Sequence, residues 1–103
     1  MELKLGLKVH EKDNVATIFA ERIVKGTQIE IHDKSGNKQL LIVLDDIPYG
    51  HKVAVTVITK GNLINKYGEE IGIATRDIKP GEHVHIHNLD SMRGRGDLER
   101  SRT

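Results

Sequence analysis

The chain has 103 residues but no cysteine, no tryptophan, only three aromatic side chains and two prolines. The lack of cysteine excludes disulfides, thiol catalysis and thiolate metal sites together. The three aromatics are too few for a platform on which nucleic-acid bases stack. Neither sign of charge predominates, because 16 basic and 15 acidic residues leave a net charge of +1. We therefore expect no overall field that gathers nucleic acid and no nucleic-acid partner.

Long hydrophobic runs are absent as well. No apolar stretch approaches the roughly 20 residues that cross a bilayer. The opening residues, Met-Glu-Leu-Lys-Leu-Gly, lack the hydrophobic body of a signal peptide. A chain of this length supports one core but not a substantial second one. The sequence thus predicts one folded domain in a cytoplasmic protein without a membrane partner.

Glycine, in contrast, is plentiful, and it recurs in a phrase of the form Ile-x-x-Gly-x-x-(Ile or Val). The four copies begin at Ile23, Ile47, Ile58 and Ile78. In each copy an apolar residue ends one segment, glycine permits a tight reversal, and a second apolar residue opens the next segment. The unequal spacing of the copies argues against a solenoid of fixed period. The phrase therefore predicts turns between short strands.

The segments between these turns are rich in β-branched and apolar residues. We predict strands over residues 15–19, 27–31, 40–44, 53–58 and 71–75. Gly36 and Asn37 tolerate positive φ, so a hairpin loop is expected over 33–37. One helical turn is expected over 62–67. The fold class predicted is mainly β, a single small barrel-like or clip-like domain with short strands and little helix.

Three of the six histidines lie at alternate positions in the run Gly-Glu-His-Val-His-Ile-His-Asn. On a strand, His83, His85 and His87 would share one face, with Val84 and Ile86 directed at a core. Imidazole titrates near neutrality and binds transition metals as the free base, so this face favours a metal or acid/base site. Same-face neighbours lie about 6.5 Å apart on a flat strand, which suits a metal held by two of them. The alternative is a polar face of hydrogen-bonded imidazoles.

Two further phrases place reactive side chains beside glycine turns. His51 and Lys52 follow a Pro-Tyr-Gly turn, and Lys66 and Tyr67 precede another glycine. Histidine or lysine can serve as a base, and tyrosine can donate a hydrogen bond to an oxyanion. The alternative is that the lysines are solvated and that Tyr67 belongs to the core with its hydroxyl at the surface.

The C-terminal residues differ in character from the rest. Residues 91–103 hold four arginines against two acidic residues, so they cannot build a core of their own. We divide the chain into a domain over 1–90 and an arginine- and glycine-rich tail over 91–103. The tail is either a disordered terminus or an arm that orders against a partner or an acidic substrate, because arginine pairs bidentately with carboxylates.

Five phrases, taken in order, resemble the small subunit of the altronate dehydratase family. They are Gly-His-Lys-Val-Ala at 50–54, Ile-x-x-Gly at 58–61, Ile-x-Lys-Tyr-Gly at 64–68, Ile-Gly-x-Ala-Thr at 71–75 and Gly-Glu-His-Val-His-x-His-Asn at 81–88. The resemblance begins at His10 and includes an Asp-Asn-Val-Ala phrase. The small subunits of sulfolactate sulfo-lyases carry similar phrases. This module is similar to the SAF domains, so the resemblance implies a β-clip fold related to the type III antifreeze proteins.

The resemblance also implies a chemistry and a partner. In the family this module accompanies a much larger, metal-dependent catalytic part, which we expect here as a separate polypeptide without which the chain is inactive. The expected reaction dehydrates a sugar acid to a 2-keto-3-deoxy acid, while a metal stabilises the enediolate and a base takes the proton. The alternatives are a sulfolactate sulfo-lyase and a non-catalytic SAF-like binding or assembly module. Exposed strand edges would allow a homodimer when the partner is absent.

Site roles follow from the family pattern as expectations. The residues expected to be catalytic are His51, Lys66, Tyr67 and His85. Those expected to bind the anionic substrate are Lys52, Asn88, Arg93 and Arg95. The residues expected to bind metal are His83, His85 and His87. The metal implied is iron(II) or manganese(II), held here or mainly by the large subunit, and the substrate is altronate, galactarate, sulfolactate or another hydroxy acid.

Overall fold

The computed structural model describes residues 4–91, and within them the chain forms nine short strands. They are β1 (Leu5–Lys8), β2 (Val15–Ile18), β3 (Gln28–Asp33), β4 (Lys38–Ile42), β5 (Lys52–Ala54), β6 (Leu63–Lys66), β7 (Glu69–Ala74), β8 (His83–Val84) and β9 (Leu89–Ser91). In this described part, no helix has the length and apolarity to cross a membrane. The mainly β fold class predicted from the sequence is confirmed.

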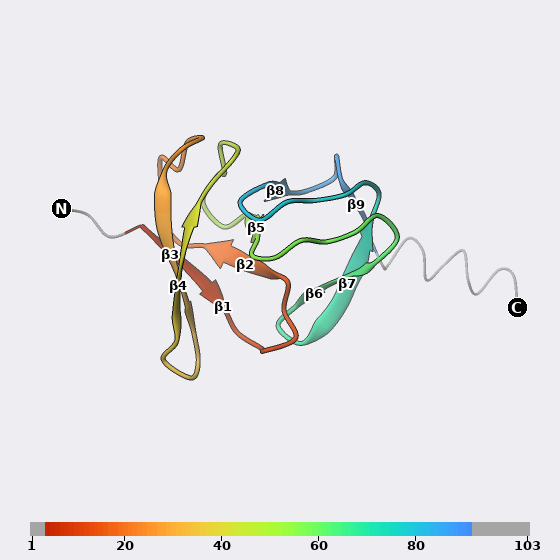
Figure 1. Ribbon diagram of the computed structural model, residues 1–103, viewed down its shortest axis with the longest axis horizontal. Helices are drawn as coiled ribbons and strands as arrows, with labels where there is room; N and C mark the ends of the chain where they lie inside the picture. The colour runs from red at the N-terminus through yellow and green to blue at the C-terminus, as the bar shows by residue number, and fades with distance from the viewer. Residues whose placement is uncertain (1–3, 92–103) are drawn as a thin grey trace, which may run out of the picture.

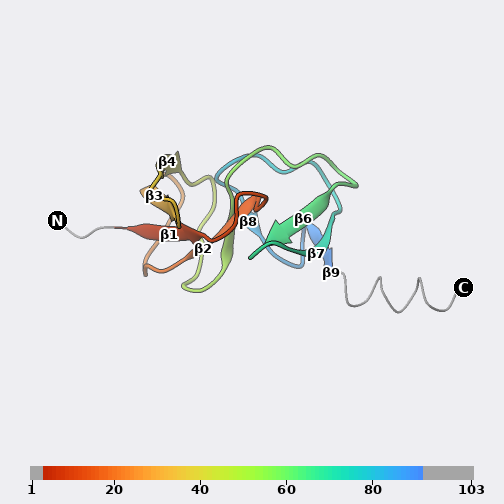
Figure 2. The same cartoon turned by 90° about the horizontal axis from the view of Figure 1, so that it is seen from below.

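The strands form two sheets. The larger has the order β4-β3-β1-β2-β5-β8 and the smaller the order β6-β7-β9. Figures 1 and 2 place β3 and β4 toward one end of the long axis and β6, β7 and β9 toward the other, with β8 between them. The larger sheet curls. Just after β4, the Leu44 N–H donates at 2.8 Å to the carbonyl of Gly81, which precedes β8, and Gln39 Nε2 of β4 donates at 3.0 Å to the carbonyl of Val55, which follows β5. The outer side of β4 is thereby joined to the far end of the same sheet.

The four Ile-x-x-Gly phrases form four equivalent turns, as predicted. Each glycine has a φ between +82° and +96°, and its N–H donates to the carbonyl of a buried residue. The N–H of that buried residue donates back to the residue after the glycine. The four pairs are Gly26 with Val43, Gly50 with Ile18, Gly61 with Ala74 and Gly81 with Ala54. The isoleucines that open the phrases are buried and pair through the bridges Ile23–Ile47 and Ile58–Ile78.

The core consists of two clusters of isoleucine, valine, leucine and alanine that share the central strands β2 and β5. Ala16 and Val53 pack in the first cluster, whereas their neighbours Val15 and Ala54 pack in the second. This division follows from strand geometry, because successive side chains point to opposite faces. The two strands therefore join both clusters into one body.

The observed strands differ from the predicted ones in particular places. The hairpin loop over 33–37 is confirmed between β3 and β4. The strand predicted over 53–58 ends early, at Ala54. The helical turn predicted over 62–67 is wrong: this segment is β6, which pairs with β7. The two residues between these strands, Tyr67 and Gly68, have φ values of +56° and +79°, as a tight two-residue hairpin requires.

Candidate functional site

Four imidazoles gather where β8 ends. His51 Nδ1 and His83 Nε2 lie 3.0 Å apart in a hydrogen bond. The ring centroids of His51 and His85 are 4.8 Å apart, and those of His83 and His87 are 5.6 Å apart. One ligand atom from each of His51, His83 and His85 lies within 4.8 Å of the others. These three residues are called the histidine triplet below.

The strand expected through the histidine run is only two residues long. It ends at Val84, and the Asn88 N–H closes a turn by donating to the His85 carbonyl at 3.1 Å. Val84 is fully buried as predicted, but Ile86 is 83% exposed, so the prediction that it faces a core is wrong. The rings of His83 and His85 lie 5.4 Å apart with only 8° between their planes. The turn, rather than strand alternation, brings them side by side.

Asn88 holds this turn from inside. The side chain is 0% exposed; its Oδ1 accepts from the His85 N–H and its Nδ2 donates to the His83 carbonyl, both at 2.9 Å. Its own carbonyl accepts from the Thr75 N–H at 3.0 Å. The substrate contact expected for Asn88 stays a prediction, and the partners observed are main-chain atoms.

Asp45 supports the same turn, and sequence reasoning missed it. Its Oδ2 accepts from the His83 N–H at 2.9 Å. The only sequence signal was the pair of aspartates before Ile47, whose second member, Asp46, accepts from the Lys25 N–H at 2.9 Å. One aspartate thus stabilises a glycine turn and the other holds the histidine turn.

The environment favours the neutral form of two of these rings, His83 and His85. Burial, followed by the neighbouring His51, His85 and His87, lowers the pKa of His83 to about 4, against the opposing effect of Asp45. Burial also lowers the pKa of His85, with further contributions from His51, Lys52 and His87. Neutral imidazole is the form that binds a transition metal.

A second group of reactive side chains lies beside the histidines. Lys52 of β5 is in register with Thr17 of β2, and the Thr17 Oγ1 lies 3.3 Å from the Tyr67 hydroxyl oxygen. The Lys66 Nζ is 4.9 Å from the centre of the Tyr67 ring. Burial and then the charge of Lys66 lower the pKa of Lys52, and Lys52 in turn contributes to the lowered pKa of His85. The two groups are therefore electrostatic neighbours.

The turn that carries Tyr67 has its own buried support. Asp13 is 4% exposed and accepts three main-chain N–H groups: Oδ2 from His10 at 3.0 Å and Tyr67 at 2.9 Å, and Oδ1 from Gly68 at 2.8 Å. Tyr67 is 47% exposed, so the alternative that it belongs to the core does not hold. Asp13, from the Asp-Asn-Val-Ala phrase that contributed to the resemblance, thus holds the Tyr67–Gly68 turn.

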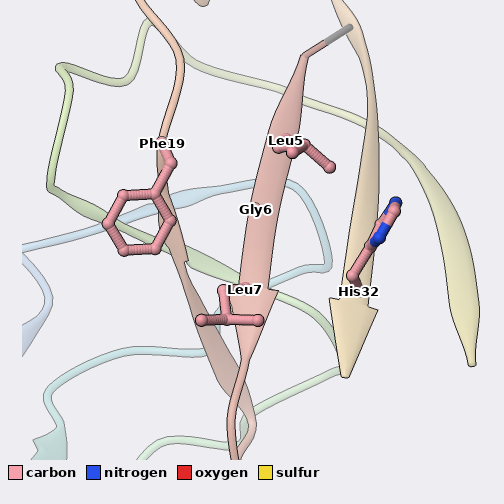
Figure 3. Close-up of a pocket in the computed structure, with 5 residues that line it drawn as sticks. All are labelled: Leu5, Gly6, Leu7, Phe19 and His32. Carbon is pink, nitrogen blue, oxygen red and sulfur yellow. The ribbon is translucent and has the colours of Figure 1, made fainter. Parts of the chain in front are cut away.

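Other expected or notable features lie apart from these groups. Arg93 and Arg95 fall outside the described residues. A shallow groove of about 320 Å³ opens over β1, where Leu5 and Leu7 project between Phe19 on one side and His32 on the other (Figure 3). The groove is apolar apart from His32, whose Nε2 lies 2.8 Å from Glu30 Oε1. It contains none of the residues predicted to act in catalysis.

Comparison with known proteins identifies the family. The family described as altronate/galactarate dehydratase SAF domain matches residues 4–92. The chain is 40% identical over 82 residues to the altronate dehydratase of Escherichia coli (strain K12) and 40% identical over 86 residues to that of Bacillus subtilis (strain 168). These matches cover 80% and 84% of this chain but only 15% and 16% of the relatives.

A third relative has a different length. The chain is 31% identical over 94 residues to the (2R)-sulfolactate sulfo-lyase subunit alpha of Chromohalobacter salexigens, and this match covers 88% of the chain and 99% of that subunit. The resemblance to both groups is thereby confirmed, together with the SAF fold. The chain belongs to the altronate/galactarate dehydratase SAF-domain family.

Proposed function

We propose that this chain is the SAF-domain subunit of a two-chain hydro-lyase that dehydrates an anionic sugar acid. The observation that carries the proposal is the position of Lys52 between two groups of reactive side chains. Lys52 is an electrostatic neighbour of His85 in the histidine triplet and also of Lys66, whose Nζ lies over the Tyr67 ring. The names of the altronate dehydratases support a sugar acid as substrate. The match to nearly the whole of a protein named as a subunit supports the two-chain arrangement.

Lys52 forms the anion-binding part of the site, and Lys66 lies beside it. Within residues 4–91, neither Lys52 nor Lys66 has a carboxylate at salt-bridge distance. The charge of Lys66 disfavours the charged form of Lys52, and after burial it is the second cause of the lowered pKa of Lys52. A substrate carboxylate bound at Lys52 offsets this repulsion and leaves Lys66 to act as the base. In the complete enzyme we expect Arg93 and Arg95 to add further positive charge.

The donor set of the histidine triplet suits a divalent transition metal. Zinc–nitrogen bonds of 2.0–2.1 Å, for example, place tetrahedral ligand atoms about 3.3 Å apart, close to the 3.0 Å between His51 Nδ1 and His83 Nε2. Three protein ligands leave coordination positions open, as in catalytic metal sites. We therefore propose His51, His83 and His85 as ligands in place of the set with His87. Iron(II) or manganese(II), when bound, would supply Lewis-acid stabilisation of the enediolate.

With the triplet engaged in metal binding, proton transfer falls to Lys66 and Tyr67. The reaction takes a proton from the carbon beside the carboxylate and releases the hydroxyl group of the next carbon as water. Lys66 is the candidate base, and the Tyr67 hydroxyl, directed at Thr17, is the candidate hydrogen-bond donor. Asp13 holds the main chain of the Tyr67–Gly68 turn, which directly follows Lys66.

An anaerobic assay tests the proposal. This chain is mixed with the large dehydratase-like chain from the same source and with ferrous or manganese ion, and keto-acid release from altronate and galactarate is followed. Turnover that requires both chains supports the proposal. Turnover by the large chain alone, with no binding between the chains, refutes it and favours a separate SAF-like binding module.

A sulfo-lyase is the second candidate, favoured by the match to 99% of the sulfo-lyase subunit. The same site would then expel sulfite rather than water from sulfolactate and leave pyruvate. The same mixture assayed with sulfolactate distinguishes the two, because only a sulfo-lyase releases sulfite. Sulfite release without turnover of either sugar acid would replace the dehydratase assignment.

A further inference from the structure

We propose that Asn88 is the positioning residue of the histidine triplet: its buried amide sets His83 and His85 against His51. The metal-binding consequence rests on the function proposed above, whereas the positioning itself does not. Asn88 is 0% exposed, and the partners of its side chain are main-chain atoms of His83 and His85. Its influence must therefore pass through the main chain of the turn.

The amide acts on the two main-chain groups that flank Val84. It donates to the His83 carbonyl and accepts from the His85 N–H, both at 2.9 Å. These are the two kinds of hydrogen bond that a neighbouring strand would make, and Asn88 makes them at the point where β8 ends. Without it a carbonyl and an N–H in a partly buried turn lose their partners, which costs more than a solvent-exposed bond would.

Two other contacts make this amide decisive for ring geometry. The His83 N–H is held by Asp45 at 2.9 Å, and the His83 ring is bonded to His51. His83 is thus fixed from both sides, whereas the described contacts of the His85 main chain come from Asn88. Asn88 therefore controls where the third ring lies relative to the other two.

The chain contains a matched control for this residue. Asn14 makes the same pair of bonds: its Nδ2 donates to the Leu63 carbonyl at 3.0 Å and its Oδ1 accepts from the Asn65 N–H at 2.9 Å. Each asparagine therefore bridges the carbonyl of one residue and the N–H of the residue two positions later. Asn14 holds β6, however, and touches no histidine of the triplet. Asn14→Ala removes the same chemistry from a different place.

Cobalt(II) serves as the metal probe, because its visible spectrum reports the ligand geometry. We expect the full-length wild-type chain to bind cobalt and Asn88→Ala to bind it about 10- to 100-fold more weakly, the range typical of residues that orient metal ligands. Asn14→Ala should change the affinity less than about threefold on the same scale, although we expect thermal unfolding to show a lower Tm for both variants. Equal affinities of Asn88→Ala and wild type would overturn the proposal, as would an equal loss in Asn14→Ala.

A metal-free measurement separates this inference from the proposed function. Nuclear Overhauser contacts between the rings of His51 and His85, whose centroids are 4.8 Å apart, should be present in wild type and Asn14→Ala and lost in Asn88→Ala. If wild type binds no cobalt, the metal role fails and the ring contacts alone decide the role of Asn88. If Asn88→Ala does not fold, Asn88→Asp replaces it, because it keeps an acceptor for His85 but sets an oxygen against the His83 carbonyl. Unchanged ring contacts in that variant would refute the proposal.

Discussion

His51 Nδ1 and His83 Nε2 share a hydrogen bond of 3.0 Å although 32 residues separate them in the chain. One nitrogen must carry the proton and the other must accept it, so neither of these two atoms is paired with solvent. A metal ion bound by both atoms would need a lone pair on each, so the donating ring would carry its proton on its other nitrogen instead. The bond therefore marks the place where metal and proton compete.

Loss of His51 should weaken metal binding more than loss of His87. His51 belongs to the group whose ligand atoms lie within 4.8 Å of one another, whereas His87 does not. Titration calorimetry with cobalt(II) should show at least about a hundredfold loss of affinity for His51→Ala and less than about threefold for His87→Ala. The reverse order would restore the ligand set expected from the sequence, His83 with His85 and His87.

The two lysines should affect turnover differently. Lys52 is proposed to bind the substrate carboxylate, so Lys52→Ala should mainly raise KM in the two-chain assay. Lys66 is proposed as the base, so Lys66→Ala should lower kcat by about 100-fold or more. Lys34→Ala, an exposed change in the distant hairpin loop, is the control and should leave both constants as they are. Full activity of Lys66→Ala would remove that residue from the mechanism.

Asp13→Asn should destabilise the fold and displace Tyr67. Asparagine has one carbonyl oxygen, so it cannot accept the three N–H groups that the buried carboxylate accepts. We expect a loss of about 3 kcal/mol in the free energy of unfolding, because bonds to a charged group in a buried site are strong. Urea unfolding measures this loss. Asp77→Asn is the control, since exposed Asp77 accepts one N–H, from Lys60, and a loss as large there would contradict the prediction.

Gly81→Ala should be more harmful than Gly61→Ala, although both glycines have similar positive φ values of +96° and +89°. A Cβ at Gly81 would collide with the Ile42 carbonyl, whereas a Cβ at Gly61 would meet open space. Both changes carry a backbone cost of about 1–2 kcal/mol, and only Gly81→Ala adds the clash where the sheet curls. Thermal unfolding should therefore show the larger decrease in Tm for Gly81→Ala. Equal decreases would mean that the sheet is not closed at this point.

The metal-free protein should lose stability as the pH falls from 6.5 toward 4. The pKa of His83 is about 4 in the folded chain, against an ordinary value of 6.5. The unfolded chain therefore binds more protons between these values, and stability rises with pH across the same window and levels off above it. Urea unfolding at several pH values, with His83→Gln for comparison, measures the effect. A His83 titration by NMR with a midpoint near 6.5 would contradict it.

Local features of the sequence predicted the turns well and the strands partly. The four Ile-x-x-Gly phrases and the loop over 33–37 formed as predicted, because the backbone freedom of glycine acts within a few residues. Strand β6 was mistaken for a helical turn, since its stability comes from pairing with β7 and from Asn14, which lies 51 residues from its partner Asn65. A local sequence pattern does not indicate which distant residues will pair with a segment.

The amino-acid sequence by itself determined the mainly β class, the turn positions and the apolar core, and it supplied the candidates for the site. Only the tertiary structure decided that His51 joins His83 and His85, that Asn88 faces inward, and that Asp13 reaches Tyr67, 54 residues away. The physical reason is the range of the forces involved. Turn and strand preferences act between neighbours in the chain, whereas the site is assembled by hydrogen bonds and burial that arise only after distant strands have paired.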